Sequence, residues 1–385
     1  MDKANLCIIG SGLASYNLAK QWRQKEPDGQ LTIVTANQGC FYSKPLLSTA
    51  LSSGALPNDL IFHDASAMAK QLHANILTET HVSDIDVHAK QVICEHGESF
   101  AYQNLLLALG AMPRVIPLEG DATSAVIYIN QWEDYCAFRS RLAPFQSAHV
   151  IILGAGLVGC EFANDLTCAG HKVSIIAPDA WPLEKLLPQS CGKALQSALS
   201  KQGVNWHLSS SIASVDYAEK SLKVTDQHGK SYTGDLVLSA AGIAPCTALA
   251  QKAGLCVIEG IVVDQYSATS SPNIYALGDC AQFDGEIQPY VAPIMHGARA
   301  LAATLTGNPT AVSYPVMPIV LKTSCMPTMI FKRPSTSVAS WSAVFQDKTG
   351  LRAEGFDSEN KLSTVVLMGS QITQRQAVLK SLSQS

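Results

Sequence analysis

Two segments of this chain, 144 residues apart, carry the same pattern, in which a short apolar run leads directly into a glycine turn. The first is Leu6-Cys7-Ile8-Ile9 followed by Gly10-Ser11-Gly12-Leu13-Ala14-Ser15, and the second is Val150-Ile151-Ile152-Leu153 followed by Gly154-Ala155-Gly156-Leu157-Val158-Gly159. A helical stretch and another apolar run come next in each segment. The pattern predicts two copies of a unit made of a strand, a tight turn, a helix and a second, parallel strand.

The spacing of the glycines is typical of a turn that binds a nucleotide. The first glycine allows the tight turn, the second lets the backbone approach a pyrophosphate, and the third small residue lets the helix pack on the strand. The helix N-terminus then faces the phosphate charge. Chance would produce one such match about 0.1 times in a chain with this glycine content, so two matches in the right context favour a protein with two nucleotide sites.

Length and composition limit the class of protein further. The 385 residues correspond to roughly 2.6 domains, and the net charge of −4 with only 15% charged residues excludes a disordered chain and a basic, nucleic-acid-binding surface over the whole molecule. No apolar stretch approaches about 18 residues, so no membrane insertion is expected. The eleven cysteines form no zinc-ligand spacing, which predicts no metal site and the reduced thiols of a cytoplasmic protein.

Three further motifs indicate which nucleotides bind. A strand ends on Gly278-Asp279 in the run Thr269–Asp279, and the stretches Leu107–Pro113 and Leu238–Pro245 leave their strands on similar turns. Together with both glycine turns, these motifs resemble the flavoproteins with two dinucleotide-binding domains in the pyridine nucleotide–disulfide reductase superfamily. The resemblance implies FAD at the first turn and NAD at the second, with Asp279 accepting hydrogen bonds from the ribityl chain of FAD.

The fold class that follows is α/β, with two Rossmann-like FAD/NAD(P)-binding domains and a small α+β C-terminal domain. We expect a discontinuous FAD-binding domain at 1–115 and 243–316, an NAD-binding domain at 116–242 and the C-terminal domain at 317–385. Within that last domain, short apolar runs predict strands at 319–321, 328–331, 338–345 and 362–368, followed by a helix at 372–382.

Most members of the superfamily pass electrons through a pair of cysteines, spaced Cx4C or CxxC, and neither spacing occurs here. The run Tyr42-Ser43-Lys44-Pro45-Leu46-Leu47-Ser48 instead resembles a segment of reductases that feed iron–sulfur proteins. Over essentially the whole chain, the resemblance is to bacterial NADH:rubredoxin reductases, with flavorubredoxin reductases next. It implies hydride transfer from NADH to FAD, then single electrons passed to rubredoxin, a small acidic iron protein, commonly for an alkane hydroxylase. We expect a monomer or weak dimer.

The same resemblance implies the site residues. Lys44 and Glu161 are expected to be catalytic and to form an ion pair at the hydride-transfer site. The FAD-binding residues are expected to be Gly10, Ser11, Gly12, Leu13, Ala14, Thr35, Ala36, Ser43, Lys44, Val82, Glu161, Asp279, Val291 and Lys322, and the NAD-binding residues Gly154, Gly156, Gly159 and Asp179.

The chain departs from the family pattern at two strand ends. The acid that usually binds the FAD adenosine ribose is missing, since Thr35-Ala36-Asn37 stands there, so Thr35, the Ala36 backbone or a water must make that contact. Ala177 takes the corresponding position in the second domain, with Asp179 as the nearest acid. Because this strand end has no cation to meet a 2′-phosphate, NADH is expected to be preferred over NADPH.

Three alternatives to rubredoxin reduction remain open at this point. The first is a flavorubredoxin reductase in nitric oxide detoxification. The second is an NADH peroxidase or oxidase that uses Cys40 as a single redox cysteine, although Cys40 lies about four residues earlier than that chemistry would require. The third is a flavoprotein that binds NADH without useful turnover, against which Lys44 and Glu161 argue.

Overall fold

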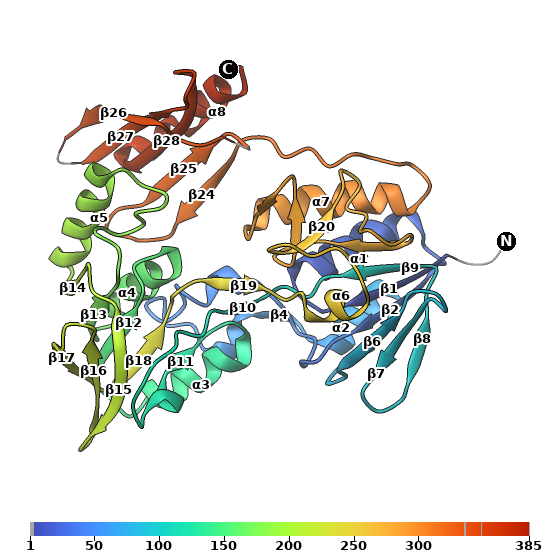
Figure 1. The fold of residues 1–385 in the computed structure, drawn as a ribbon, viewed down its shortest axis with the longest axis horizontal. Helices are drawn as coiled ribbons and strands as arrows, with labels where there is room; N and C mark the ends of the chain where they lie inside the picture. The colour runs from blue at the N-terminus through green and yellow to red at the C-terminus, as the bar shows by residue number, and fades with distance from the viewer. Residues whose placement is uncertain (1–3, 335, 348, 385) are drawn as a thin grey trace. The chain divides into compact units, whose positions relative to one another are not determined.

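The computed structural model describes residues 4–334, 336–347 and 349–384, and the two glycine turns lie in two different units of the chain (Figure 1). The first unit comprises Met1–Ser43, Asp59–Met112 and Ala244–Tyr314, and the second comprises Lys44–Asn58, Pro113–Ile243 and Pro315–Ser385. The segment Lys44–Asn58, which carries the predicted site residue Lys44, therefore groups with the second unit. The boundaries that we expect for three domains stay a prediction.

The first unit is built on a parallel sheet with the strand order β21-β9-β1-β2-β5. Alternate side chains of the central strand β1 enter two apolar cores, because successive residues of a strand point to opposite faces. Leu6 and Ile8 pack with helices α1, α2 and α7, whereas Cys7 and Ile9 pack against the opposite layer. The sheet strands are β1 (Asn5–Ile9), β2 (Gln30–Val34), β5 (Asn75–Leu77), β9 (Asn104–Leu107) and β21 (Ile274–Ala276), and the three helices are α1 (Leu13–Lys25), α2 (Ala65–Leu72) and α7 (Val291–Leu305).

The opposite layer of the first unit consists of short strands, paired antiparallel except for β20 and β22, and one short helix. It contains the sheet β6-β7-β8, which contributes Ile85, Val92 and Cys94 to the core, and helix α6, which contributes Ala250. The bounds are β6 (Val82–Asp86), β7 (Gln91–Cys94), β8 (Ser99–Ala101), α6 (Ala248–Lys252), β20 (Ile261–Val263), β22 (Ala281–Phe283) and β23 (Glu286–Ile287), with β3 (Phe41–Tyr42) pairing β4 (Ile61–His63).

The second unit repeats the parallel arrangement with the strand order β11-β18-β12-β13-β14. Its central strand β12 follows the same alternation, and Ile151 and Leu153 pack against an antiparallel sheet, β15-β16-β17. The bounds are β11 (Ile127–Tyr128), α3 (Trp132–Leu142), β12 (His149–Leu153), α4 (Leu157–Cys168), β13 (Lys172–Ile176), α5 (Gln189–Lys201), β14 (Val204–His207), β15 (Ile212–Ala218), β16 (Ser221–Asp226), β17 (Ser231–Gly234) and β18 (Leu236–Ser239). The strands β10 (Ala111–Pro113) and β19 (Ile243–Pro245) pair with each other.

The C-terminal part of the second unit is an antiparallel sheet with the order β24-β25-β28-β27-β26, whose core includes Phe331, Val365 and Leu367 packed on helix α8. The predicted strands occur with slightly different ends, but strand β27 (Gly350–Phe356) was not expected, because two glycines and two charged residues weaken its apolar pattern. The helix expected from residue 372 was also wrong in its start, since a 3₁₀ turn precedes it. The bounds are β24 (Met317–Leu321), β25 (Thr328–Lys332), β26 (Ser340–Gln346), β28 (Leu362–Gly369) and α8 (Arg375–Gln384).

The described residues contain neither a membrane-spanning helix nor a cluster of metal-binding side chains. No helix in this part of the chain is both long and apolar enough to cross a lipid bilayer. Within the same residues, no three His, Cys, Asp or Glu side chains are grouped so that they could hold a metal ion.

Two histidines of the second unit are held in a polar cluster along its parallel sheet. His149 Nε2 lies 2.8 Å from Ser174 Oγ, and its backbone N–H donates to Asp235 at 2.7 Å. The ring of His207 packs on Tyr232 with a centroid distance of 4.3 Å. Burial lowers the pKa of both histidines, and the nearby Lys230 ammonium lowers that of His207 further.

We therefore expect the protein to lose stability as the pH falls below the ordinary histidine pKa of about 6.5. The folded state favours the neutral rings, so their contribution is present above that pH and is lost as the unfolded chain takes up protons first. Thermal unfolding measured from pH 8 to 5.5 should give a falling Tm, with a shallower fall in His149→Gln. His96→Gln, at an exposed position, is the control, and an identical pH slope in both variants would contradict the assignment.

Candidate active site

The first glycine turn forms an open cradle at the N-terminus of α1. Gly10 has a φ of +106°, and a Cβ built there would lie 2.3 Å from the carbonyl oxygen of Ala108, so only glycine fits. Gly12 is the N-cap of α1, has no side-chain capping bond, and would meet nothing within 4 Å if it carried a Cβ. The first helical N–H groups, beginning at Leu13 and Ala14, therefore face open space, as a bound pyrophosphate requires.

The Gly278-Asp279 motif lies next to this cradle. Gly278 has a φ of +87°, and an added Cβ would approach the Cβ of Ala14 to 3.0 Å. Val291 is the first residue of α7 and is 41% exposed, and the N-cap of that helix also lacks a side-chain capping bond. The carboxyl ends of β1 and β21 thus bring the glycine turn and Gly278-Asp279 together, which fits one extended ligand held at two points.

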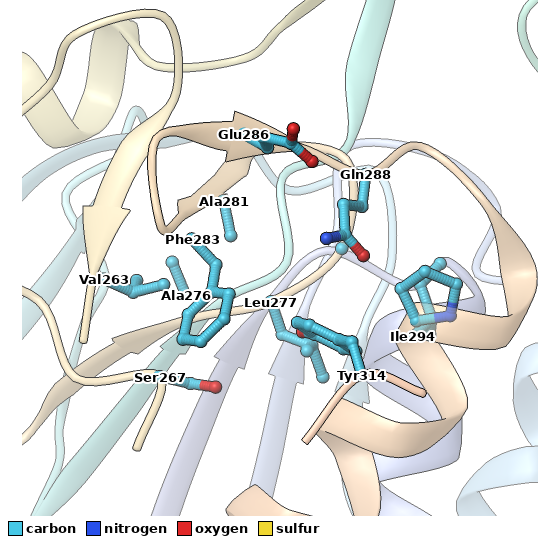
Figure 2. Close-up of a pocket in the computed structure, with 12 residues that line it drawn as sticks. Val263, Ser267, Ala276, Leu277, Ala281, Phe283, Glu286, Gln288, Ile294 and Tyr314 are labelled. Atoms are coloured by element: carbon cyan, nitrogen blue, oxygen red, sulfur yellow. The ribbon is translucent and has the colours of Figure 1, made fainter. Parts of the chain in front are cut away.

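A small cavity lies beside the same strand end, lined in part by Leu277, Phe283, Ile294 and Tyr314 (Figure 2). Its volume is only about 20 Å³. A cavity of this size has room for about one water molecule. A dinucleotide therefore does not fit inside this cavity.

A polar network stands where the usual ribose-binding acid is missing. Ser11 Oγ lies 2.9 Å from Thr35 Oγ1, and both hydroxyls donate to Asn37 Oδ1, at 2.8 and 2.9 Å respectively. The segment before Val82 pairs with this strand end, since the N–H of Thr80 donates to the carbonyl of Thr35 at 2.9 Å. The structure thus brings Ser11, Thr35 and Val82 into one region, with Ala36 exposed beside them. Sequence reasoning did not assign Asn37 a role.

The second glycine turn repeats the first. Gly154 has a φ of +118°, and an added Cβ would lie 2.6 Å from the carbonyl oxygen of Ala240. Gly156 caps α4 without a side-chain bond and faces open space, whereas a Cβ on Gly159 would meet the carbonyl oxygen of Gly154 at 2.2 Å. The three glycines therefore serve the three purposes that the spacing predicts, and the turn fits a dinucleotide.

The loop after β13 holds two acids. Asp179 is partly exposed there, and the carboxylate of Glu184 accepts a hydrogen bond from the N–H of Ala180 at 2.9 Å. Glu184 was missed in the sequence because it lies beyond the position that the dinucleotide pattern normally uses. The negative charge of Glu184, which is held against the backbone of this loop, would repel a 2′-phosphate. It therefore agrees with the expected preference for NADH over NADPH.

One side of α4 carries three buried acceptors. Glu161, Asn164 and Asp165 are 5%, 5% and 1% exposed, and their spacing places them on one face of the helix. Asp165 accepts the N–H groups of Leu51 and Ser52 at 2.9 and 2.8 Å.

The other two acceptors bind two separate segments of the second unit. Asn164 Oδ1 accepts both the N–H and the hydroxyl of Ser324 at 3.1 Å. Glu161 accepts the hydroxyl of Ser48 at 2.5 Å and the N–H of Lys322 at 3.0 Å. The face of α4 thus joins the segment after Pro45 and the end of β24 to the helix that follows the second glycine turn.

The ion pair of Glu161 differs from the expected one. Its ammonium partner among the described residues is Lys322, with an Nζ–Oε2 distance of 3.1 Å, while Lys44 Nζ donates to Asn130 Oδ1 at 2.6 Å. The predicted Lys44–Glu161 pair is thus replaced by Lys322–Glu161. The physical reason is that the backbone N–H of Lys322 already binds the carboxylate of Glu161, so the Lys322 side chain needs only to turn back toward the same carboxylate. Lys44, in contrast, is held by Asn130 beside the start of α3.

Two parallel sheets, each with an uncapped helix behind a glycine turn, define a protein that binds two dinucleotides. The chain matches the family model described as pyridine nucleotide-disulphide oxidoreductase over residues 4–299, and the model described as rubredoxin binding C-terminal domain over residues 311–382. The chain belongs to the pyridine nucleotide-disulphide oxidoreductase family. The predicted fold class, enzyme class and cofactors, FAD and NAD, are thereby confirmed.

Individual relatives resemble the chain over nearly its full length. The rubredoxin-NAD(+) reductase of Acinetobacter baylyi is 38% identical, covering 98% of this chain and 97% of its own. The nitric oxide reductase FlRd-NAD(+) reductase of Aliivibrio fischeri is 35% identical, covering 95% of each. Among solved structures, the covalent putidaredoxin reductase–putidaredoxin complex matches with a TM-score of 0.89 at 22% identity, covering 99% of this chain and 93% of that chain. The last likeness concerns the fold alone.

Substitution of Gly278 should remove FAD. Gly278→Ala forces a residue with a Cβ into the left-handed region, which costs about 1–2 kcal/mol, and pushes that Cβ against Ala14 in the first turn of α1. Gly285→Ala is the matched control, because Gly285 has a φ of +76° but nothing within 4 Å of its added Cβ. Flavin content of the purified proteins, read from absorbance, should fall only in Gly278→Ala, and equal flavin content in both would contradict the assignment.

Proposed function

We propose that this chain is an FAD-dependent NADH:rubredoxin oxidoreductase. One NADH would give a hydride to FAD, and two oxidised rubredoxins would each take one electron, leaving NAD⁺, one proton and two reduced rubredoxins. The observation that carries the proposal is the match to a rubredoxin-binding domain in a chain whose two glycine turns both face open space. FAD, when bound, supplies the conversion of a two-electron donor into single electrons.

The residues that would hold the cofactors follow from the two cradles. FAD would bind at the first turn, between Gly10–Ala14 and Asp279, with its adenosine end near Ser11, Thr35, Ala36 and Val82. NADH would bind at the second turn, between Gly154–Gly159 and Asp179. Ser43, Lys44, Glu161, Val291 and Lys322 are proposed to meet the flavin, where the ammonium groups would stabilise negative charge as it develops on the ring.

Rubredoxin in an alkane hydroxylase system is the acceptor that we propose, and a flavorubredoxin in nitric oxide detoxification is the alternative. A rubredoxin-NAD(+) reductase and a nitric oxide reductase FlRd-NAD(+) reductase resemble the chain at similar identity, 38% and 35%. The eleven free cysteines favour a reducing compartment, which supports our proposal that the protein works in the cytoplasm. A monomer or weak dimer stays a prediction.

Turnover with different acceptors tests this function. The purified protein should carry FAD and should oxidise NADH rapidly with rubredoxin, slowly with a flavorubredoxin, and negligibly with hydrogen peroxide or oxygen. Cys40→Ser should leave the rubredoxin rate unchanged, because electrons pass from the flavin without a thiol. A peroxide rate that exceeds the rubredoxin rate and disappears in Cys40→Ser would support the single-cysteine enzyme instead.

The charge of the C-terminal region supports an acidic partner. Residues 317–385 contain eight Lys or Arg and four Asp or Glu, a net charge of +4, whereas the whole chain has −4 and the remainder therefore −8. A small acidic protein would be attracted to this region and repelled by the rest of the chain. Two of the basic residues of this region, Lys332 and Arg333, are partly buried at the end of β25.

Strand register separates these two residues from Lys322. Met317 pairs with Lys332, and Leu321 pairs with Thr328, so Lys332 and Lys322 lie at opposite ends of the β24–β25 hairpin. Five residues of a strand span roughly 13–16 Å. Lys332 and Arg333 would therefore act on rubredoxin by long-range attraction, and not by lining the point where the electron leaves.

Charge reversal at this end should slow association specifically. Lys332→Glu/Arg333→Glu should lower the rubredoxin on-rate and flatten its salt dependence, since the Debye length falls from about 10 Å at 0.1 M to about 3 Å at 1 M salt. Stopped-flow reduction of the flavin by NADH, and reduction of a small uncharged quinone, should stay unchanged.

The control for this prediction is Lys220→Glu/Lys223→Glu. These exposed lysines near the β15–β16 turn give the same change in net charge in the same unit. Equal slowing by both double variants would show that overall charge, and not this end of the hairpin, governs association with rubredoxin.

A further inference from the structure

Ser48 connects the two members of the ion pair on α4. Its side chain is buried, its hydroxyl donates to Glu161 Oε2 at 2.5 Å, and it accepts a hydrogen bond from Lys322 Nζ at 3.4 Å. Three side chains from distant parts of the sequence thus form a closed triangle. Lys322 Nζ also donates to the carbonyl of Pro45, so the three donors of its ammonium are all used.

The three contacts assign different hydrogen-bond donors to the two carboxylate oxygens of Glu161. Oε2 of Glu161 receives the Ser48 hydroxyl and the Lys322 ammonium, while Oε1 receives the N–H of Lys322. A carboxylate rotates readily about its last bond, and a lysine ammonium sits on a flexible stem. The hydroxyl of Ser48, on a short side chain, is the least mobile of the three groups, and it binds both partners.

We propose that Ser48 is a positioning residue for hydride transfer, holding the Glu161–Lys322 pair in one orientation. The inference rests on the proposed function, which places this pair at the flavin. Hydrogen bonds to charged groups are stronger than those between neutral groups, so one fixed hydroxyl can select a single arrangement of a flexible pair.

The local structure does not depend on this hydroxyl. The backbone that follows Ser48 is bound to α4 through Asp165, and the end of β24 is bound to the same helix through Asn164 and Ser324. Removal of the Ser48 hydroxyl leaves those bonds in place. A change in chemistry can therefore be separated from a loss of packing.

The first test compares Ser48→Ala with Ser324→Ala, using the full chain with bound FAD. Ser324→Ala removes a hydroxyl bound to the same helix one turn further on, without touching Glu161. Stopped-flow reduction of the flavin at saturating NADH should slow about tenfold in Ser48→Ala, the loss expected when a hydrogen bond to a charged group no longer holds the reacting geometry. The NADH concentration for half-maximal rate should change less than twofold, and Ser324→Ala should react like the unmodified protein.

The second test does not depend on activity. Hydrogen exchange of the Lys322 amide, which donates to Glu161 Oε1, should become faster in Ser48→Ala, while the Ser324 amide keeps its rate. Flavin reduction as fast as in the unmodified protein, equal slowing by both variants, or an unchanged Lys322 amide would overturn the role of Ser48. If NADH does not reduce the flavin of the unmodified protein at all, the proposed function fails instead.

Discussion

The buried acceptors on α4 are the constraint on which the second unit depends. A carboxylate or amide oxygen removed from water costs free energy unless donors replace the lost hydrogen bonds, and the cost is largest for a charge. Glu161, Asn164 and Asp165 meet this requirement with donors from two remote segments, residues 48–52 and 322–324. The same helix begins at the second glycine turn. The start of α4, where a cofactor would bind, and Asn164, which holds the C-terminal region through Ser324, are consequently less than two helical turns apart.

The two glycine turns apply one physical solution twice. Each leaves a helix N-terminus without a side-chain cap, so the unpaired N–H groups and the positive end of the helix dipole are available to a pyrophosphate. In each turn the first glycine lies under the carbonyl of a neighbouring strand end, where a Cβ cannot fit. The cradles are thus fixed by backbone geometry and need little from side chains, which explains why they are visible in the sequence.

The distribution of charge separates the C-terminal region from the rest of the chain. Basic residues are in excess after residue 316, and acidic residues are in excess before it. The charge is therefore unevenly distributed along the chain, although the net charge of the whole chain is small. Within that region, Arg352 pairs with Glu354 and Lys361 with Glu359, so part of the charge is compensated locally. The remaining positive charge of this region acts over distances comparable to the Debye length. Such a charge suits the attraction of a small acidic protein more than the recognition of a particular shape.

The sequence by itself determined the parts that depend on local order: the two strand–turn–helix units, the Gly278-Asp279 strand end, the absence of a paired redox cysteine and most strands of the C-terminal sheet. Strand β27 and the late start of α8 escaped, because glycines, charges and a 3₁₀ turn blur the apolar period there. Only the tertiary structure decided that Asn37 completes the polar network beside Thr35, and that Glu161 pairs with Lys322 and Ser48 while Lys44 binds Asn130. The reason is physical, since a turn or a strand is specified by neighbours in the sequence. The partner of a buried charge is specified by whichever donor the fold brings within hydrogen-bond distance.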